Sequence, residues 1–213
     1  MLEQRIQQQF YDSADLIVQV CEQLSKPIAD AVEVVVTCIT AGGKILLAGL
    51  GPSMADAQYA AALLCGTFER SRPALPALVL ASDATSMSAL AQASGNLGLG
   101  LGRQVQALGL PGDVLVLFDV PSVDADPDTR SLASVIEAAH GKDMSVVLLT
   151  AAPPAYTDAP PRFHTAASSS LTDTDVCIAV PTERSSLVTG LHRLSWHCIC
   201  DAIDLELLGE QAS

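Results

Sequence analysis

Short apolar runs alternate with longer amphipathic stretches along most of the chain, and this alternation constrains the fold more than any other feature. Five runs have the composition of buried strands: 44–51 (KILLAGLG), 77–80 (ALVL), 113–118 (DVLVLF), 145–150 (SVVLLT) and 176–180 (VCIAV). A stretch with helical periodicity follows each of them. Strands that alternate with helices form a parallel sheet with helices on both faces. We therefore predict an α/β fold: a three-layer, doubly wound, five-stranded parallel sheet.

The N-terminal residues predict a helical extension to this sheet. Apolar side chains recur at helical spacing on one face, with polar residues between them: Leu2, Ile6, Phe10, Ile17, Cys21 and Leu24. Lys26-Pro27 interrupts the pattern, so we expect a second helix that ends near Gly42-Gly43. With no internal repeat and no second domain, we predict one domain over residues 1–213, with N-terminal helices in 1–41 and the α/β core in 42–213.

Charge and composition exclude several classes of function. The 213 residues carry a formal net charge of −13, which argues against direct binding of nucleic acid, because that needs a basic face. No run of apolar residues is long enough for a membrane span, and the polar N-terminus lacks a signal peptide, so we expect a cytoplasmic protein. The six cysteines are expected to be reduced core residues, and their spacing predicts no structural metal.

Two turns at the carboxyl ends of strands contain candidate ligand-binding residues. Gly51 and Ser53 follow the first strand and lead into a helix, and such a turn can bind a phosphate with its free N–H groups. The alternative is a tight turn with Ser53 as the helix N-cap, since Pro52 removes one donor. Asp83 follows the second strand, where it either faces the ligand cleft or caps the next helix.

Four segments together resemble one known family. They are 43–83, which contains the block FERSRP at 68–73, then 103–118 (RQVQALGLPGDVLVLF), 137–150 (EAAHGKDMSVVLLT) and 192–204 (HRLSWHCICDAID). The chain is similar to the sugar-isomerase (SIS) domain family, in the branch of the sedoheptulose 7-phosphate (phosphoheptose) isomerases. That branch also includes DiaA, which associates with the bacterial replication initiator DnaA. The resemblance covers nearly the whole chain and implies a SIS domain, whose sheet is of the flavodoxin-like type.

The resemblance also implies catalytic positions, and this sequence departs from most of them. Isomerases of the family have a zinc-binding His and Glu on the helix after the first strand, where this chain has Tyr59 and Leu63. A Gln of the last helix corresponds to Thr189, and only the last ligand is retained, as His197. One imidazole cannot hold zinc alone, so we predict no catalytic residues, no metal and no cofactor.

The loop after the third strand differs in the same way. The family has a Ser- and Thr-rich phosphate loop there, whereas this chain has four carboxylates and two prolines in residues 119–128 (DVPSVDADPD), with Ser122 as the remaining candidate ligand. Like charges a few ångströms apart would oppose phosphate binding. The acidic spacing is compatible with Mg²⁺ or Ca²⁺, but it lacks the turn of a calcium loop, and a solvated acidic loop is the simpler interpretation.

His197 is open to two interpretations. It precedes Asp201 by one helical turn, a spacing that allows a hydrogen bond to a carboxylate and a raised pKa, as for a general base. Without a metal or a second acid–base group it would instead be a core or interface histidine. His192 lies on another face of the same helix and is expected to be structural.

From these departures we predict a non-catalytic adaptor similar to DiaA. It would bind a protein partner, with the replication initiator as a candidate, and could retain a sugar phosphate at Gly51, Ser53, Asp83, Ser122 and His197. The alternatives are an active sedoheptulose 7-phosphate isomerase of heptose and lipopolysaccharide synthesis, and a sensor of a sugar derivative. The apolar N-terminal face and the apolar last helix predict a homotetramer.

Overall fold

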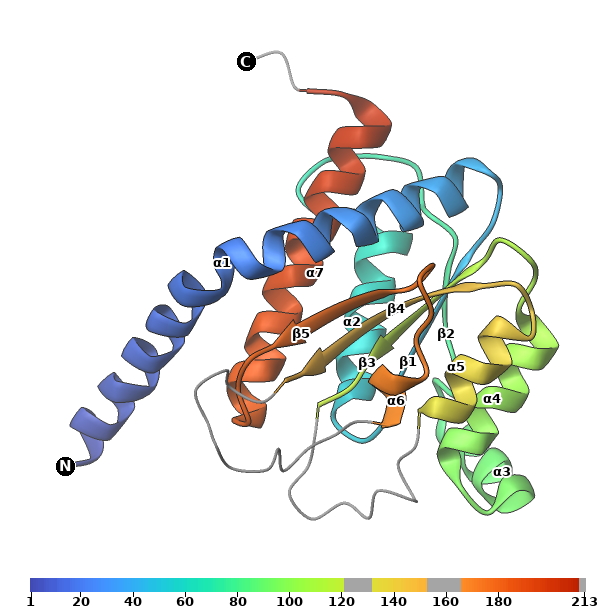
Figure 1. Cartoon of the computed structure of the whole chain (residues 1–213), viewed down its shortest axis with the longest axis horizontal. Helices are drawn as coiled ribbons and strands as arrows, with labels where there is room; N and C mark the ends of the chain where they lie inside the picture. Colours follow the sequence, from blue (N-terminus) through green and yellow to red (C-terminus); the bar gives the residue numbers. More distant parts are fainter. Residues whose placement is uncertain (121–131, 153–165, 211–213) are drawn as a thin grey trace.

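Five short strands form the centre of the molecule in the computed structural model, which describes residues 1–120, 132–152 and 166–210 (Figure 1). The strands are β1 (Ile45–Gly49), β2 (Ala77–Val79), β3 (Val114–Phe118), β4 (Ser145–Ala151) and β5 (Val176–Val180). The helices are α1 (Leu2–Thr40), α2 (Ser53–Cys65), α3 (Ala84–Ser94), α4 (Leu97–Leu108), α5 (Ala133–His140), α6 (Ala166–Ser169) and α7 (Ser185–Leu208).

All five strands are parallel and lie in the order β2-β1-β3-β4-β5. This order is that of the flavodoxin-like doubly wound fold, so the predicted fold class is confirmed. From β1 the chain first adds β2 on one side of β1, and then adds β3, β4 and β5 in turn on the other side. The crevice of the sheet therefore lies between the carboxyl ends of β1 and β3, where doubly wound domains bind their ligands.

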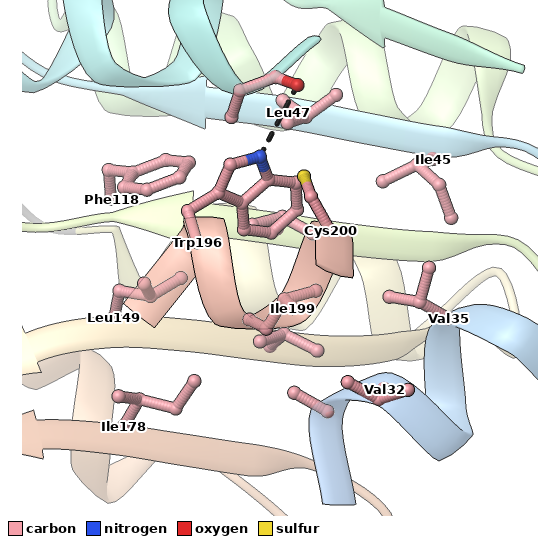
Figure 2. Close-up of a cluster of buried hydrophobic side chains, with 14 of the residues drawn as sticks. Val32, Val35, Ile45, Leu47, Phe118, Leu149, Ile178, Trp196, Ile199 and Cys200 are labelled. Carbon is pink, nitrogen blue, oxygen red and sulfur yellow. Dashed lines mark hydrogen bonds between the residues drawn. The ribbon is translucent and has the colours of Figure 1, made fainter. Parts of the chain in front are cut away.

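Two apolar layers hold the helices against the sheet. Ile45 and Leu47 of β1 point into the layer beneath α1, α2 and α7, whereas Leu46 and Ala48 point into the layer beneath α4 and α5. Figure 2 shows the first layer, where Trp196 of α7 lies edge-on to Phe118 of β3 at 5.7 Å between ring centroids. The indole Nε1 donates a hydrogen bond to the carbonyl of Ala60 in α2, at 3.3 Å (Figure 2). This contact fixes α2 against α7.

The predicted break at Lys26-Pro27 is wrong, because α1 is one helix with Pro27 inside it. The residues after the proline include Ala31, Val32 and Val35, which are buried against the sheet. This packing stabilises the helix on the far side of the proline and outweighs the hydrogen bond that the proline cannot donate. The single helix is about 58 Å long, and its N-terminal half extends beyond the sheet (Figure 1).

The stretch 151–171 contains four prolines and a run of serines, a composition that predicts an exposed loop. It lies mostly outside the described residues, except for the end of β4 and the short helix α6. Of the described helices, none combines the length and the apolar composition needed to cross a bilayer.

Candidate functional site

The turn from β1 into α2 lies at the crevice of the sheet. Gly51 has a positive φ of 59°, and a Cβ at Gly49 would lie 2.5 Å from the carbonyl oxygen of Ser53. The backbone N–H of Ser53 donates to Leu50, and that of Met54 donates to Gly51. These amides are therefore used within the turn, which favours the tight-turn interpretation over an open phosphate loop.

The predicted N-cap role of Ser53 is wrong. Pro52 occupies the cap position, and Ser53 is the first residue of the helix, buried to 1% exposure. Its hydroxyl oxygen accepts a hydrogen bond from the backbone N–H of Val120 at 3.2 Å. Val120 follows β3, so this contact bridges the two sides of the crevice.

The other two predicted ligands of this edge do not join Ser53. Asp83 is the N-cap of α3, where its carboxylate accepts the backbone N–H of Ser86 at 2.8 Å. Hydrogen bonds from the hydroxyl and backbone of Ser86 hold the pKa of Asp83 below its usual range. The capping alternative is therefore the one that the geometry supports. Ser122 lies outside the described residues.

His197 has a different partner from the one that its sequence position predicts. Its Nε2 lies 2.8 Å from the hydroxyl oxygen of Tyr59, which comes from α2. The expected hydrogen bond to Asp201 is absent, because the ring of His197 points across the helix interface and not along its own helix. The ring of Phe68 stacks on the imidazole, at 5.3 Å between centroids. Tyr59 and His197 thus form a hydrogen-bonded pair between α2 and α7.

An ion pair with a buried carboxylate and a half-exposed guanidinium borders the Tyr59–His197 pair. Asp56 precedes Tyr59 by one turn of α2, and its carboxylate accepts a hydrogen bond from Nε of Arg193 at 2.7 Å. The Asp56 side chain is 3% exposed and the Arg193 side chain 50% exposed. The guanidinium lies over the face of Tyr59, 5.7 Å from the ring centroid. Because Asp56 anchors one nitrogen, the positive charge is held beside the phenol.

The segment after α2 is attached to α7 by two arginines. Arg72 is buried and bonds through Nε to the carboxylate of Asp204, at 2.5 Å, in a pair whose side chains are both 1% exposed. Its terminal nitrogens donate to the carbonyls of Leu63 and Leu64. Arg70 donates to the carbonyls of Asp204 and Gly209. These contacts position the segment that carries Phe68 over His197.

A second histidine of α7 lies in the core beneath the crevice. His192 is fully buried, and its Nε2 lies 3.2 Å from the carbonyl oxygen of Thr150, at the end of β4. A carbonyl only accepts, so Nε2 carries the proton and Nδ1, which has no partner among the described residues, does not. Burial lowers the pKa of His192 to about 4. The residue is neutral and structural, as predicted.

The zinc site implied by the resemblance does not fit these residues. Within the described ranges, no group of three His, Cys, Asp or Glu side chains lies close enough together to bind a metal ion. The Nε2 of His197 faces a phenol, and the neighbouring position on α2 is Leu63, whose side chain has no donor atom. Zinc sites in proteins need three or four nitrogen, sulfur or carboxylate ligands.

Sequence reasoning missed most of this arrangement. The resemblance identifies Tyr59 only as a replaced ligand, although Asp56 and Tyr59 share one face of α2, and Arg193 and His197 share one face of α7. Such spacings, three and four residues apart, were the available signal for a shared site. The pairing of the two helices depends on tertiary packing, and no local pattern indicates it.

Comparisons with known proteins agree on one family. The SIS domain family matches residues 9–151. The phosphoheptose isomerase of Methylibium petroleiphilum is 46% identical over 211 residues, covering 99% of this chain and 98% of the relative. That of an Azoarcus species is 36% identical over 205 residues and covers 96% of both chains.

Solved structures give the same result. The phosphoheptose isomerase of Francisella tularensis superimposes with a TM-score of 0.81 at 28% identity, over 96% of this chain and 98% of that one. The phosphoheptose isomerase GmhA of Neisseria gonorrhoeae superimposes with a TM-score of 0.79 at 30% identity, over 96% and 99%. These full-length matches to proteins named as isomerases contradict the predicted adaptor function. That prediction gave the replaced ligands more weight than the similarity along the rest of the chain.

Proposed function

The chain belongs to the SIS domain family, and from this membership we propose that it is a sugar-phosphate isomerase of the phosphoheptose isomerase type. Its substrate would be a seven-carbon ketose phosphate, sedoheptulose 7-phosphate. The observation that carries the proposal is the 46% identity to a phosphoheptose isomerase along 99% of the chain. An adaptor would need to share only the fold with such enzymes.

The geometry supports the reaction class. Interconversion of a ketose and an aldose moves one proton between adjacent carbons and needs a group that can take up and return it. Tyr59 and His197 are two acid–base groups in direct contact, and Tyr59 is 38% exposed, so the pair is accessible. The positive charge of Arg193 lies beside them. A proton-transfer group and a cation at one place are what an enediolate intermediate requires.

We also propose that the protein acts as a homotetramer. The N-terminal half of α1 carries large apolar side chains that are more than half exposed, among them Leu2, Phe10 and Val18. An apolar cavity of about 240 Å³ lies between this part of α1 and the start of α7, lined by Leu16, Leu187 and Leu194 among others. A second copy that covers these surfaces would remove them from water.

An isomerisation assay tests the function. Purified protein is incubated with sedoheptulose 7-phosphate, and the aldose product is followed by proton NMR. We expect conversion in proportion to protein concentration, and no conversion of a five-carbon ketose phosphate at the same concentration. The absence of conversion of the seven-carbon sugar, with and without added zinc, would refute the proposal.

A further inference from the structure

We propose that Tyr59 and His197 carry the proton transfers of this isomerisation without a bound metal ion, and that Arg193 stabilises the enediolate. This inference rests on the proposed function and assigns the chemistry to particular side chains. It follows from three features: the phenol–imidazole hydrogen bond, the guanidinium over the phenol, and the lack of a metal ligand set in the part of the chain that the structure describes.

The pair is built to hold one geometry. The Tyr59 hydroxyl and His197 Nε2 are 2.8 Å apart, within the range of a strong hydrogen bond. Phe68 stacks on one face of the imidazole, and Arg193 lies over the phenol ring. Neither ring can rotate freely without losing a contact. Because α2 and α7 are fixed by the buried Trp196–Ala60 hydrogen bond one residue away, the two helices hold the pair in register.

Tyr59 is the more exposed residue of the pair, so a substrate would approach it from the solvent. With the imidazole proton on Nδ1, Nε2 accepts the phenol proton, and the phenol oxygen keeps free lone pairs. Tyr59 Oη can then take a proton from C1 of the ketose while its own proton passes to His197 Nε2. The C1–H bond breaks, its electrons form the C1–C2 double bond, and the C2 carbonyl becomes an oxyanion. The product of this step is an enediolate and an imidazolium.

The return step restores every group. The C1 hydroxyl proton passes to the C2 oxygen, and the electrons of the enediolate form the C1 aldehyde. Tyr59 gives a proton to C2 and recovers one from the imidazolium. The sugar gains and loses one proton, the pair does the same, and no oxidant or reductant takes part. This is the proton balance of a ketose-to-aldose conversion.

Arg193 supplies the positive charge that the oxyanion needs. Its Nε is bound to Asp56, whereas its two terminal amino groups form no hydrogen bond with any described residue. A guanidinium presents these two groups as a planar fork, which suits an enediolate with two adjacent oxygens. Asp56 is buried and lies on the side away from solvent, so it orients the fork outward. Arg193 thereby stabilises the negative charge of the enediolate, as a bound metal ion would in a site that has metal ligands.

The closing experiment separates this inference from the proposed function. Turnover of sedoheptulose 7-phosphate is measured before and after dialysis against a chelator, together with the zinc content of the protein. We expect substoichiometric zinc and unchanged turnover after chelation. Turnover that disappears with the chelator and returns with zinc would overturn the metal-free mechanism and leave the proposed function standing. No turnover under any condition would overturn both.

Variants test the individual residues. Tyr59→Phe keeps the ring and its contact with Arg193 but removes the hydroxyl, and kcat should fall about 10²- to 10⁴-fold. Tyr11→Phe, on the exposed part of α1, is the matched control and should leave kcat unchanged. The pH profile gives a readout that a structural role would not move: Tyr59→Phe and His197→Gln should each change the dependence of kcat on pH. Wild-type kcat and pH profile in Tyr59→Phe would contradict the assignment.

Solvent exchange gives a second readout. In heavy water the wild-type protein should introduce deuterium at the carbon beside the carbonyl, and Tyr59→Phe should not. Arg193→Lys keeps the positive charge but not the planar fork, so we expect a lower kcat. Deuterium incorporation should still occur in this variant, with a rate that falls in proportion to kcat. Exchange in Tyr59→Phe at the wild-type rate would show that another group takes the proton, and would overturn the proposal.

Discussion

At the scale of single residues, His192 should make stability depend on pH. Burial lowers the pKa of His192 to about 4, from 6.5 for an exposed histidine. Between these values the unfolded chain binds a proton at this residue and the folded protein does not. The free energy of unfolding should therefore fall as the pH falls from 6.5 to 4, by about 3 kcal/mol in total from this residue.

Urea unfolding at several pH values measures this effect. His192→Gln keeps a donor for the Thr150 carbonyl but does not titrate, so its free energy of unfolding should change less steeply over the same window. Both proteins share all the other titrating groups, so the difference between their slopes isolates His192. Equal slopes would show that the imidazole is not buried in its neutral form.

The buried ion pair Arg72–Asp204 and the exposed ion pair Lys26–Asp30 should differ greatly in their contribution to the free energy of unfolding. Arg72→Met leaves the carboxylate of Asp204 buried without a counter-charge, so we expect a loss of about 3–5 kcal/mol. Lys26→Met removes a pair with Asp30 in which the lysine side chain is 82% exposed, and should cost less than about 1 kcal/mol. Chemical denaturation of both variants gives the comparison. Similar losses would contradict the burial of the Arg72–Asp204 pair.

At the scale of elements, the turn between β1 and α2 should tolerate no side chain at its first position. A Cβ at Gly49 would meet the backbone of Ser53 at 2.5 Å, so Gly49→Ala should destabilise the protein by about 1–3 kcal/mol. Gly190, exposed within α7, has nothing within 4 Å of such a Cβ. Gly190→Ala should therefore be neutral or stabilise by up to about 1 kcal/mol. Thermal unfolding of the two variants distinguishes a local clash from a general intolerance of alanine.

The sequence predicted helices and strands correctly where the apolar pattern of a single segment was enough to define the element. The five strands followed from their apolar composition to within two residues at either end, and the last helix, α7, was also expected. The break at Pro27 was wrong because the tertiary contacts of Ala31 and Val35 override the local signal. The Ser53 cap was wrong because Pro52 takes that position and Ser53 bonds to Val120, 67 residues away.

The candidate site was predicted only in part, for the same reason. The sequence identifies His197 but predicts a partner within its own helix, at Asp201. The structure brings Tyr59 to it from 138 residues away. A contact at that separation depends on how α2 and α7 pack on the sheet, and the sequence pattern of either helix is silent about it.

At the scale of the whole molecule, assembly should depend on the extended part of α1. Ile6 and Phe10 are 50% and 73% exposed on this helix, which projects past the sheet (Figure 1). Ile6→Asp combined with Phe10→Asp adds two carboxylates to the apolar face, so we expect the tetramer to dissociate. Light scattering gives the mass of each protein. Glu3→Asp combined with Gln7→Asp, on the polar side of the same turns, is the control.

Two results would contradict a tetramer that assembles through the extended part of α1. A wild-type mass of about 22 kDa, that of one chain, would rule out assembly altogether. An unchanged mass in the Ile6, Phe10 variant would place the interface elsewhere. The isomerisation assay on the dissociated variant then shows whether the exposed Tyr59–His197 pair needs a neighbouring chain to cover it.

The Trp196–Ala60 hydrogen bond has a consequence for how this protein can change over generations. Trp196 and Ala60 are buried and join the two helices, while the residues beside them in sequence, His197 and Tyr59, are partly exposed and contact each other. The scaffold and the reactive groups thus occupy adjacent but separate positions. A single mutation at 59 or 197 alters the chemistry and leaves the interior packing intact. The reactive residues at positions 59 and 197 can therefore be replaced one mutation at a time during evolution, while the buried Trp196–Ala60 contact keeps the fold.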